Sequence, residues 1–328
     1  MERSARTADG NGVIPATTWA LSDGRAGNAR QADALAQALH AGPVRTYTLV
    51  PRWPWRAGAP LRTPGSAFAF GQGFASDLLA PPGVAIGCGR QAALATRLLR
   101  THGARAVQIL DPRLDPRHWD IVVAPYHDLL HGANVLSTLG SLHPVDDEWL
   151  AQGRAAFPQL AALPQPRTAV LVGAPSRHAS LGLDACERFA TQLLDVLASQ
   201  GGSVLLTASR RTPAAWRATL RHRFAQASGV VWLGPDDGEN PYAGLLGWAD
   251  RIVCTPDSVN MISEACATPV PVHVFEPDAS QGRLRRFLHV LRGQERIRAF
   301  DPALQPFDVT PLRETARVAM QVRSRLGL

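Results

Sequence analysis

The feature that most constrains the fold is an alternation of short apolar runs with segments of helical periodicity. Thr17–Ser22 has the apolar character of a strand, and the segment from Ala29 onward places its apolar residues on one helical face. Gly83–Gly87 and Arg90–Arg100 repeat this strand–helix unit. Because strands that alternate with helices pair in parallel, the pattern predicts a doubly wound α/β sheet.

A Pro-rich polar stretch, Phe157–Arg167, interrupts the alternation, which restarts at Thr168–Val172. A chain of 328 residues is about twice the usual domain size, so we expect two Rossmann-like domains that face a cleft. The expected divisions are a disordered leader over residues 1–15, an N-terminal domain over 16–160, a C-terminal domain over 161–310, and a helix in 311–328 that packs back on the N-terminal domain.

The chain contains no lysine, so its 34 basic side chains are all arginine. A Walker A loop, a pyridoxal phosphate site and the Tyr-x-x-x-Lys pair of short-chain dehydrogenases each need a lysine amine, and the sequence excludes all three. The arginines are spread along the chain, so the net charge of +7 does not predict nucleic-acid binding. A soft attraction to anionic lipid or phosphate is still expected.

Export, membrane crossing and structural zinc are not predicted. No stretch approaches the roughly 20 apolar residues of a membrane span, and residues 1–15 lack the apolar segment of a signal peptide. The four cysteines lack C-x-x-C spacing, which indicates free thiols in a reducing compartment. We expect a cytoplasmic protein in peripheral contact with an anionic membrane surface, at the inner membrane face.

The strongest candidate site is the segment Thr255–Ala265, where a strand gives way to a helix whose first turn is rich in small polar residues. The N–H groups and dipole of such a helix start suit a phosphate. Ser258 would donate to that phosphate, and Glu264 would accept the hydroxyl protons of a ribose. The alternative is that Asp257 or Ser258 is only a helix cap and Glu264 only a helix carboxylate.

Three other loops of the second half support the same site. Ser209–Pro213 follows a strand and offers two guanidinium groups and two hydroxyls at a helix start, although arginine pairs are also common on solvated surfaces. Asn240–Tyr242 precedes a short helix and could close over a base or ribose; otherwise it is a turn. Gly173 would let a ligand approach the backbone.

Candidate catalytic bases lie in the first half. Asp23 stands in a Gly-rich turn after the first strand, where an Asp is also a common turn former. His127 and Asp128 follow another strand and place an imidazole beside a carboxylate. The chain has no Asp-x-Asp triplet, which favours a metal-independent mechanism that uses arginines and helix dipoles.

The run Gly87-Cys88-Gly89-Arg90-Gln91-Ala92 matches the G-x-G-x-x-A pattern of dinucleotide sites, and Asp111 ends the next strand. An NAD(P)-dependent nucleotide-sugar enzyme is therefore an alternative function. Close helix–strand packing explains the glycines equally well. A separate segment, Pro51–Arg56, mixes tryptophan with arginine and suits a lipid headgroup interface or an acceptor pocket; the alternative is an ordered loop packed on its own domain.

In combination, these motifs resemble the mitochondrial fission, elongated-mitochondria family of bacterial and plant proteins, over roughly Thr17–Phe300. The resemblance implies a domain similar to GT-B glycosyltransferases, some of which act on lipid-linked sugars. It also implies that Ser258 and Asn260 contact a diphosphate and that Glu264 contacts the ribose. Tyr126 stands where the family pattern has an acidic residue before the His-Asp pair, a departure that puts a catalytic role for this loop in doubt.

The resulting hypothesis is a metal-independent GT-B glycosyltransferase that takes a nucleotide-diphosphate sugar on its C-terminal domain, uses no cofactor, and acts on a lipid-linked or envelope acceptor held by the N-terminal domain. The alternative is a non-enzymatic binding or scaffold protein. The predicted catalytic residues are Asp23, His127 and Asp128. The predicted donor site comprises Gly173, Ser209, Arg210, Arg211, Thr212, Asn240, Tyr242, Asp257, Ser258, Asn260, Met261 and Glu264.

Overall fold

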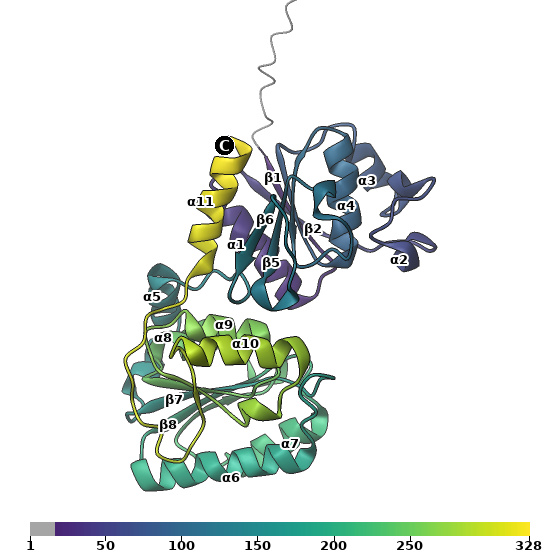
Figure 1. The fold of residues 1–328 in the computed structure, drawn as a ribbon. Coiled ribbons are helices and arrows are strands. Elements are labelled where there is room, and N and C mark those ends of the chain that lie inside the picture. Colours follow the sequence, from purple (N-terminus) through teal and green to yellow (C-terminus); the bar gives the residue numbers. More distant parts are fainter. Residues whose placement is uncertain (1–16) are drawn as a thin grey trace, which may run out of the picture. The chain divides into compact units, whose positions relative to one another are not determined.

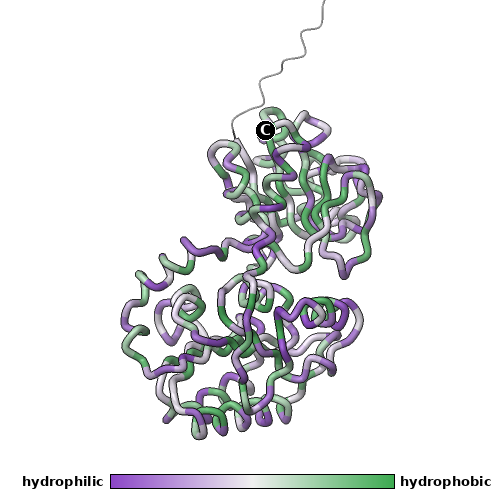
Figure 2. The backbone as a smooth tube through the Cα atoms, turned by 60° about the vertical axis from the view of Figure 1, so that its left-hand side comes forward, coloured by the Kyte–Doolittle hydropathy of each residue, from purple (hydrophilic) through white to green (hydrophobic). Residues whose placement is uncertain are grey.

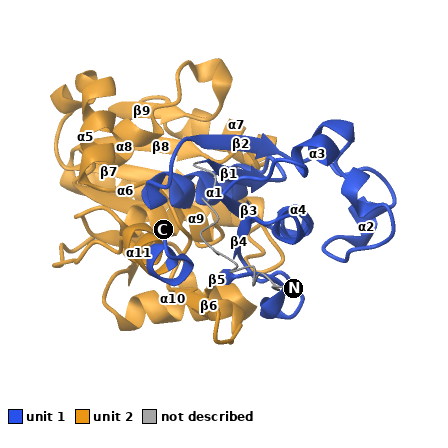
Figure 3. Ribbon diagram, turned by 90° about the horizontal axis from the view of Figure 1, so that it is seen from above, with its two compact units in different colours: residues 1–122, 322–328 blue, residues 123–321 orange. Residues whose placement is uncertain are grey.

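The computed structural model describes residues 17–328, so the leader expected over residues 1–15 lies outside the described residues. Contacts divide the chain into two compact units, residues 1–122 with 322–328 (unit 1) and residues 123–321 (unit 2) (Figure 3). Within residues 17–328, no helix has both the length and the apolar character needed to cross a membrane.

The first sheet has six strands in the order β2-β1-β3-β4-β5-β6 (Figure 1). The chain runs from β1 to the edge strand β2 on one side and then to β3 on the other, and these pairs are parallel. The strands are β1 (Thr18–Ser22), β2 (Val44–Thr48), β3 (Val84–Cys88), β4 (Arg105–Ile109), β5 (Ile121–Pro125) and β6 (Val135–Thr138).

The helices of unit 1 bury one face each against this sheet. Helix α1 (Ala26–Leu39) contributes Leu35 and α4 (Arg90–Thr101) contributes Leu94 to the core, and both side chains are fully buried. The short helices α2 (Trp55–Gly58) and α3 (Gln72–Asp77) lie in the long connection from β2 to β3. Both ribbon views place α2 beyond α4, away from the sheet (Figures 1 and 3).

The second sheet also has six parallel strands, in the order β12-β11-β10-β7-β8-β9. From the central strand β7 the chain first builds β8 and β9 on one side and then returns to β10 on the other. The strands are β7 (Arg167–Val172), β8 (Ser203–Ala208), β9 (Gly229–Trp232), β10 (Arg251–Cys254), β11 (Val272–Val274) and β12 (Arg298–Ala299).

Helices cover this sheet through amphipathic faces. Helix α6 (Leu183–Gln200) buries Phe189, Leu193 and Val196, and its polar and apolar residues alternate along the coil in Figure 2. The other helices of the second half are α5 (Asp147–Ala156), α7 (Ala214–Arg223), α8 (Tyr242–Trp248), α9 (Val259–Cys266), α10 (Gly282–Gly293) and α11 (Glu314–Leu326).

These elements confirm the predicted α/β class with two Rossmann-like sheets. The expected linker, Phe157–Arg167, follows α5 and ends at the first residue of β7. Residues 322–328 belong to unit 1, where the Arg323 guanidinium donates a hydrogen bond to the Leu39 carbonyl. The exact domain boundaries stay predictions.

Candidate functional site

The loop after β10 leads into α9, and Ser258 caps this helix. Ser258 Oγ accepts a hydrogen bond from the Met261 N–H at 3.4 Å, as the helix-cap interpretation of this residue expects. The N–H groups of Val259 and Asn260 donate to no acceptor within residues 17–328. These N–H groups and the helix dipole favour an anion at this end of α9.

Asp257 is a buried carboxylate that connects this loop to the loop after β7. Its Oδ2 accepts a hydrogen bond from the Ala174 N–H at 2.5 Å, and its Oδ1 is buried without a partner in the described part of the chain. Burial raises the pKa of this carboxyl, while the Thr255 hydroxyl, the Ala174 N–H and the Arg211 guanidinium act to lower it. Arg211 therefore lies close enough to act on Asp257 through its charge.

Gly173 makes room for this carboxylate. A Cβ at Gly173 would lie 1.8 Å from Asp257 Oδ2, so no larger residue fits there. The Gly173 N–H donates to Thr255 Oγ1 at 2.8 Å, and its carbonyl accepts from the Thr212 hydroxyl at 2.6 Å. From the sequence we expected a ligand to approach the backbone here, whereas the group that does so in the structure is the Asp257 carboxylate. A contact of Gly173 with a ligand stays a prediction.

The loop after β8 is fixed by its hydroxyls and leaves its arginines exposed. Thr212 is buried and donates to Gly173, so Ser209 Oγ is the donor in the 3.0 Å contact between the two hydroxyls. Arg210 and Arg211 are exposed. The two guanidinium groups, rather than the two hydroxyls, are therefore the groups of this loop that can meet an anion.

Sequence analysis missed Arg217, which holds this loop from α7. Its guanidinium donates to the carbonyl oxygens of Ser209 at 3.1 Å and Arg210 at 3.0 Å. Arg217 stands four residues after Pro213, which is the N-cap of α7, and this one-turn spacing is the signal that could have found it.

The three loops meet at the point where the strand order of the second sheet reverses. Strands β10, β7 and β8 are neighbours, and all are parallel, so their carboxyl ends lie at one edge of the sheet. The reversal falls between β7 and β10, and ligands of open α/β sheets bind at such a switch point. The loops offer N–H groups and two guanidinium groups there, which is an arrangement suited to a phosphate or diphosphate.

Tyr242 and Glu264 form a buried pair beside this edge. The Tyr242 hydroxyl donates to Glu264 Oε2, and only 2% of the Glu264 residue surface is exposed. Asn240 Oδ1 accepts from the Tyr242 N–H at 3.1 Å and so fixes the start of α8. The structure thus brings Asn240, Tyr242 and Glu264 together, as expected from the sequence. The predicted contact of Glu264 with a ribose stays a prediction.

His127 and Asp128 lie on a single 3₁₀ turn, Tyr126–Asp128, that packs against α10. The His127 ring packs edge-to-face on Phe287 at 5.5 Å, and its Nδ1 is buried without a partner in the described chain. Asp128 forms an ion pair with Arg283 at 3.3 Å instead of a hydrogen bond with the imidazole.

The surroundings of His127 favour its neutral form. Burial lowers the pKa of His127. The charges of Arg283 and Arg286 lower this pKa further, whereas the charge of Asp128 raises it. The Arg286 guanidinium also donates to the His127 carbonyl at 2.9 Å. Sequence analysis missed both arginines, although their spacing of three residues on one helix face could have indicated a shared anionic partner.

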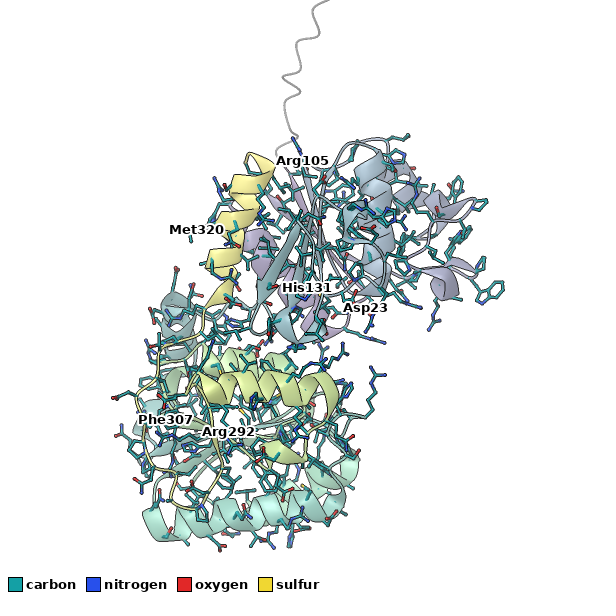
Figure 4. All side chains as sticks on the ribbon, viewed as in Figure 1. Asp23, Arg105, His131, Arg292, Phe307 and Met320 are labelled. Carbon is teal, nitrogen blue, oxygen red and sulfur yellow. The ribbon has the colours of Figure 1, made fainter. Side chains whose placement is uncertain are left out.

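Asp23, the remaining predicted base, lies in unit 1 at the carboxyl end of β1 (Figure 4). Its Oδ1 accepts from Asn28 Nδ2 at 2.9 Å and from the Arg25 N–H at 3.2 Å. The second contact is the geometry of an Asx turn, which is the turn-former alternative. A catalytic role for Asp23 stays a prediction.

The glycines of the dinucleotide-like motif have packing roles. A Cβ at Gly87 would lie 2.7 Å from Thr96 Cγ2 on α4, and a Cβ at Gly89 would lie 2.7 Å from Asn28 Nδ2. Asp111 is engaged locally by an ion pair with Arg113 at 3.2 Å. These contacts account for the motif through close helix–strand packing and so weaken the nicotinamide alternative.

The four cysteines are free and buried. Among residues 17–328, no three His, Cys, Asp or Glu side chains are grouped so that they could hold a metal ion.

The two parallel sheets with flanking helices define an α/β protein of the GT-B class, and solved structures share this fold. UDP-GlcNAc 2-epimerase from Neisseria meningitidis, bound to UDP-GlcNAc, is similar with a TM-score of 0.50, 12% identity and coverage of 94% of this chain and 100% of that one. The S. aureus MnaA–UDP structure has a TM-score of 0.51 and 11% identity, and the match covers 95% of this chain and 97% of that one. Os79 from O. sativa, in complex with U2F and trichothecene, has a TM-score of 0.51 and 13% identity, and the match covers 94% of this chain and 91% of that one. At these identities the similarity shows the fold alone.

The chain belongs to the family described as mitochondrial fission ELM1, whose model matches residues 26–326. Mitochondrial fission protein ELM1 of Arabidopsis thaliana is 31% identical over 277 aligned positions, and the match covers 75% of this chain and 64% of the plant protein. The match thus spans less than two thirds of that relative. An uncharacterised protein of Rickettsia prowazekii is 25% identical over 355 aligned positions, covering 94% of this chain and 98% of that protein.

Proposed function

We propose that this protein is a metal-independent glycosyltransferase of the GT-B class, which binds a nucleotide-diphosphate sugar on unit 2 without a further cofactor. The observation that carries the proposal is the joining of three post-strand loops at the β7/β10 switch point. Asp257, Gly173 and Thr212 lock these loops together, while Arg211 and the first N–H groups of α9 stay available to an anion. Two solved structures of similar fold hold UDP-GlcNAc or UDP, which fits this chemistry.

In the proposed reaction an acceptor hydroxyl attacks the anomeric carbon of the sugar. The bond between that carbon and the diphosphate oxygen breaks, and the electron pair leaves with the nucleoside diphosphate. Arg210, Arg211 and the start of α9 would stabilise the charge that develops on the leaving group. A base would take the acceptor proton, for which we propose neutral His127 with Asp128, or Asp23. Asp257, which is buried, acts as a positioning residue for the loops.

We further propose that the N-terminal half holds a lipid-linked or envelope acceptor. We also propose that the protein acts in the cytoplasm, at the inner face of the membrane.

A non-enzymatic binding protein is the second candidate, and one contact favours it. Asp128 is paired with Arg283 and makes no hydrogen bond with His127. Without such a bond the carboxylate does not orient the imidazole as a catalytic pair requires. A binding protein of this kind would keep the nucleotide site and lack turnover.

A thermal-shift panel tests the donor site. Uridine, guanosine, cytidine and thymidine diphosphates and their sugars are screened against the full chain, with NAD and NADP as comparison ligands. Because a ligand that binds only the folded state stabilises it, a diphosphate at about 100 times its Kd should raise the Tm by several degrees. No shift with any diphosphate, or a shift with nicotinamide cofactors alone, contradicts the proposal. Release of free nucleoside diphosphate from the stabilising sugar then separates the enzyme from the binding protein.

A further inference from the structure

Unit 1 carries a concentration of exposed apolar side chains that the donor site does not use. Five of the nine large apolar side chains exposed within residues 17–328 lie in the connection from β2 to β3: Val50, Trp53, Leu61, Phe68 and Leu79. Trp53 is 80% exposed and Leu79 is 85% exposed. This concentration in one connection makes the connection a candidate interaction surface.

This segment is ordered and already anchored, so its exposed side chains are not core residues left outside by loose packing. Its own Phe74 and Leu78 are buried in the core of unit 1. The Arg52 N–H donates to the Ala69 carbonyl at 2.8 Å, and the Arg97 guanidinium donates to the Pro60 carbonyl at 2.7 Å. These contacts anchor the backbone of the connection to unit 1.

A basic groove lies beside Trp53. It has a volume of ≈ 510 Å³ and is lined by Arg25, Trp53, Arg56, Ala57, Arg90 and Gln91. No carboxylate lines it, although Arg25 reaches Asp23 at 3.5 Å. Between residues 50 and 80 the single acidic residue is Asp77, which accepts a hydrogen bond from the Tyr47 hydroxyl at 2.9 Å. The charge around Trp53 is thus positive.

A tryptophan beside guanidinium groups matches the boundary of an anionic bilayer. Tryptophan is favoured at the headgroup level, arginine pairs with lipid phosphate, and apolar neighbours enter the acyl boundary. A soluble anion would account for the groove but not for Leu61, Phe68 or Leu79, which gain nothing from it. A protein partner would not require the charge to be of one sign.

We infer that unit 1 docks on an anionic lipid surface through the connection 50–79, with lipid phosphates in the groove of Arg25, Arg56 and Arg90 and with Trp53 at the headgroup level. This docking does not depend on the donor site in unit 2, and it would place the chain at the surface that carries lipid-linked acceptors. Each basic side chain near such a surface strengthens binding by about fivefold.

Vesicle co-sedimentation of the full chain tests this inference. The vesicles are phosphatidylcholine alone, or phosphatidylcholine mixed with phosphatidylglycerol. We expect binding to the mixed vesicles, weakened at high ionic strength, and little binding to phosphatidylcholine. Equal binding to both vesicles, or to neither, overturns the inference. Binding of inorganic phosphate without binding to vesicles also overturns it.

Matched variants locate the surface. Arg56→Glu should lower the vesicle partition coefficient at least tenfold, and Trp53→Ser should lower it several-fold. Arg105→Glu makes the same charge change at an exposed arginine on the opposite edge of the sheet, and Met320→Ser removes an exposed apolar side chain elsewhere (Figure 4). Both controls should bind as the parent does. Equal losses in Arg56→Glu and Arg105→Glu would show a diffuse charge effect and contradict the assigned surface. Because donor binding is measured by thermal shift, failure of either proposal is seen separately.

Discussion

In each Rossmann-like half, a polar side chain lies over a glycine at the switch point of the sheet, but the two side chains differ in charge. In unit 1 the Asn28 side chain lies over Gly89, donates to Asp23, and accepts from the Cys88 thiol at 3.7 Å. In unit 2 the Asp257 carboxylate lies over Gly173, and its Oδ1 is left without a partner. The Asn28 side chain is a neutral amide that both donates and accepts a hydrogen bond, whereas the Asp257 side chain is a carboxylate with one oxygen that lacks a partner.

This difference indicates that the contact in unit 1 serves packing and that the contact in unit 2 serves function. A buried polar atom without a partner costs free energy of about 1–3 kcal/mol, and a buried carboxylate costs more. The unit 1 contacts need no function to explain them. The unit 2 contacts place a destabilising group where three loops, two exposed arginines and a helix start come together. Sites of this kind are where proteins keep groups that weaken the fold.

The largest expected effect is on stability when the Gly173 space is filled. Gly173→Ala places a methyl group 1.8 Å from Asp257 Oδ2, so the loops must separate, and we expect a loss of about 3 kcal/mol. Asp257→Ala removes the obstacle but leaves the Ala174 N–H without its acceptor, a loss of about 1–3 kcal/mol. Chemical denaturation of the two single variants and the double variant measures the coupling between them.

The double variant should lose less unfolding free energy than the sum of the two single losses, by at least about 1 kcal/mol. The matching cycle in unit 1 uses Gly89→Ala and Asn28→Ala. Gly89 has a φ of +91°, so backbone strain persists after Asn28 is removed and the rescue should be smaller. Additive losses for Gly173 and Asp257 would show that the carboxylate does not occupy the Gly173 space.

A smaller effect is expected in the pH dependence of stability. Burial raises the pKa of Asp257 above its ordinary value of 3.8. The folded chain then holds this proton more tightly than the unfolded chain, so the contribution of Asp257 to stability falls as pH rises from about 3.8 through the folded pKa. Asp257→Asn lacks this ionisation. The stability of the parent relative to Asp257→Asn should therefore decrease between pH 4 and pH 7, and parallel profiles would contradict the buried-charge account.

The sequence predicted the fold class and the loops of the site better than the role of each residue in them. Apolar runs and helical periodicity depend on neighbouring residues, so the strands and helices could be predicted without the structure. Ser258 caps α9, as the alternative interpretation of this residue expected, and its contact with a phosphate stays a prediction. The contacts of Asp257 with Gly173 and of Tyr242 with Glu264 join residues 84 and 22 positions apart, and no local pattern specifies such a pairing.

The missed residues show the same limit. Arg217, Arg283 and Arg286 act through carbonyl and carboxylate partners brought by other loops. In a chain whose 34 basic residues are all arginine, composition gives no sign of which arginines are engaged. Gly87 and Gly89 fit a motif for dinucleotides, but their contacts with Thr96 and Asn28 become visible only when helix and strand are packed.

The central claim is that the switch point of unit 2, and not that of unit 1, binds a nucleoside diphosphate. Isothermal titration calorimetry of UDP and UDP-GlcNAc onto the parent, Arg211→Ala and Arg105→Ala tests it most directly. Because charge-assisted hydrogen bonds contribute about 1.5–3 kcal/mol, Arg211→Ala should weaken binding at least tenfold, while Arg105→Ala should bind as the parent does. Equal affinity in all three proteins, or no heat of binding in the parent, would contradict the assignment.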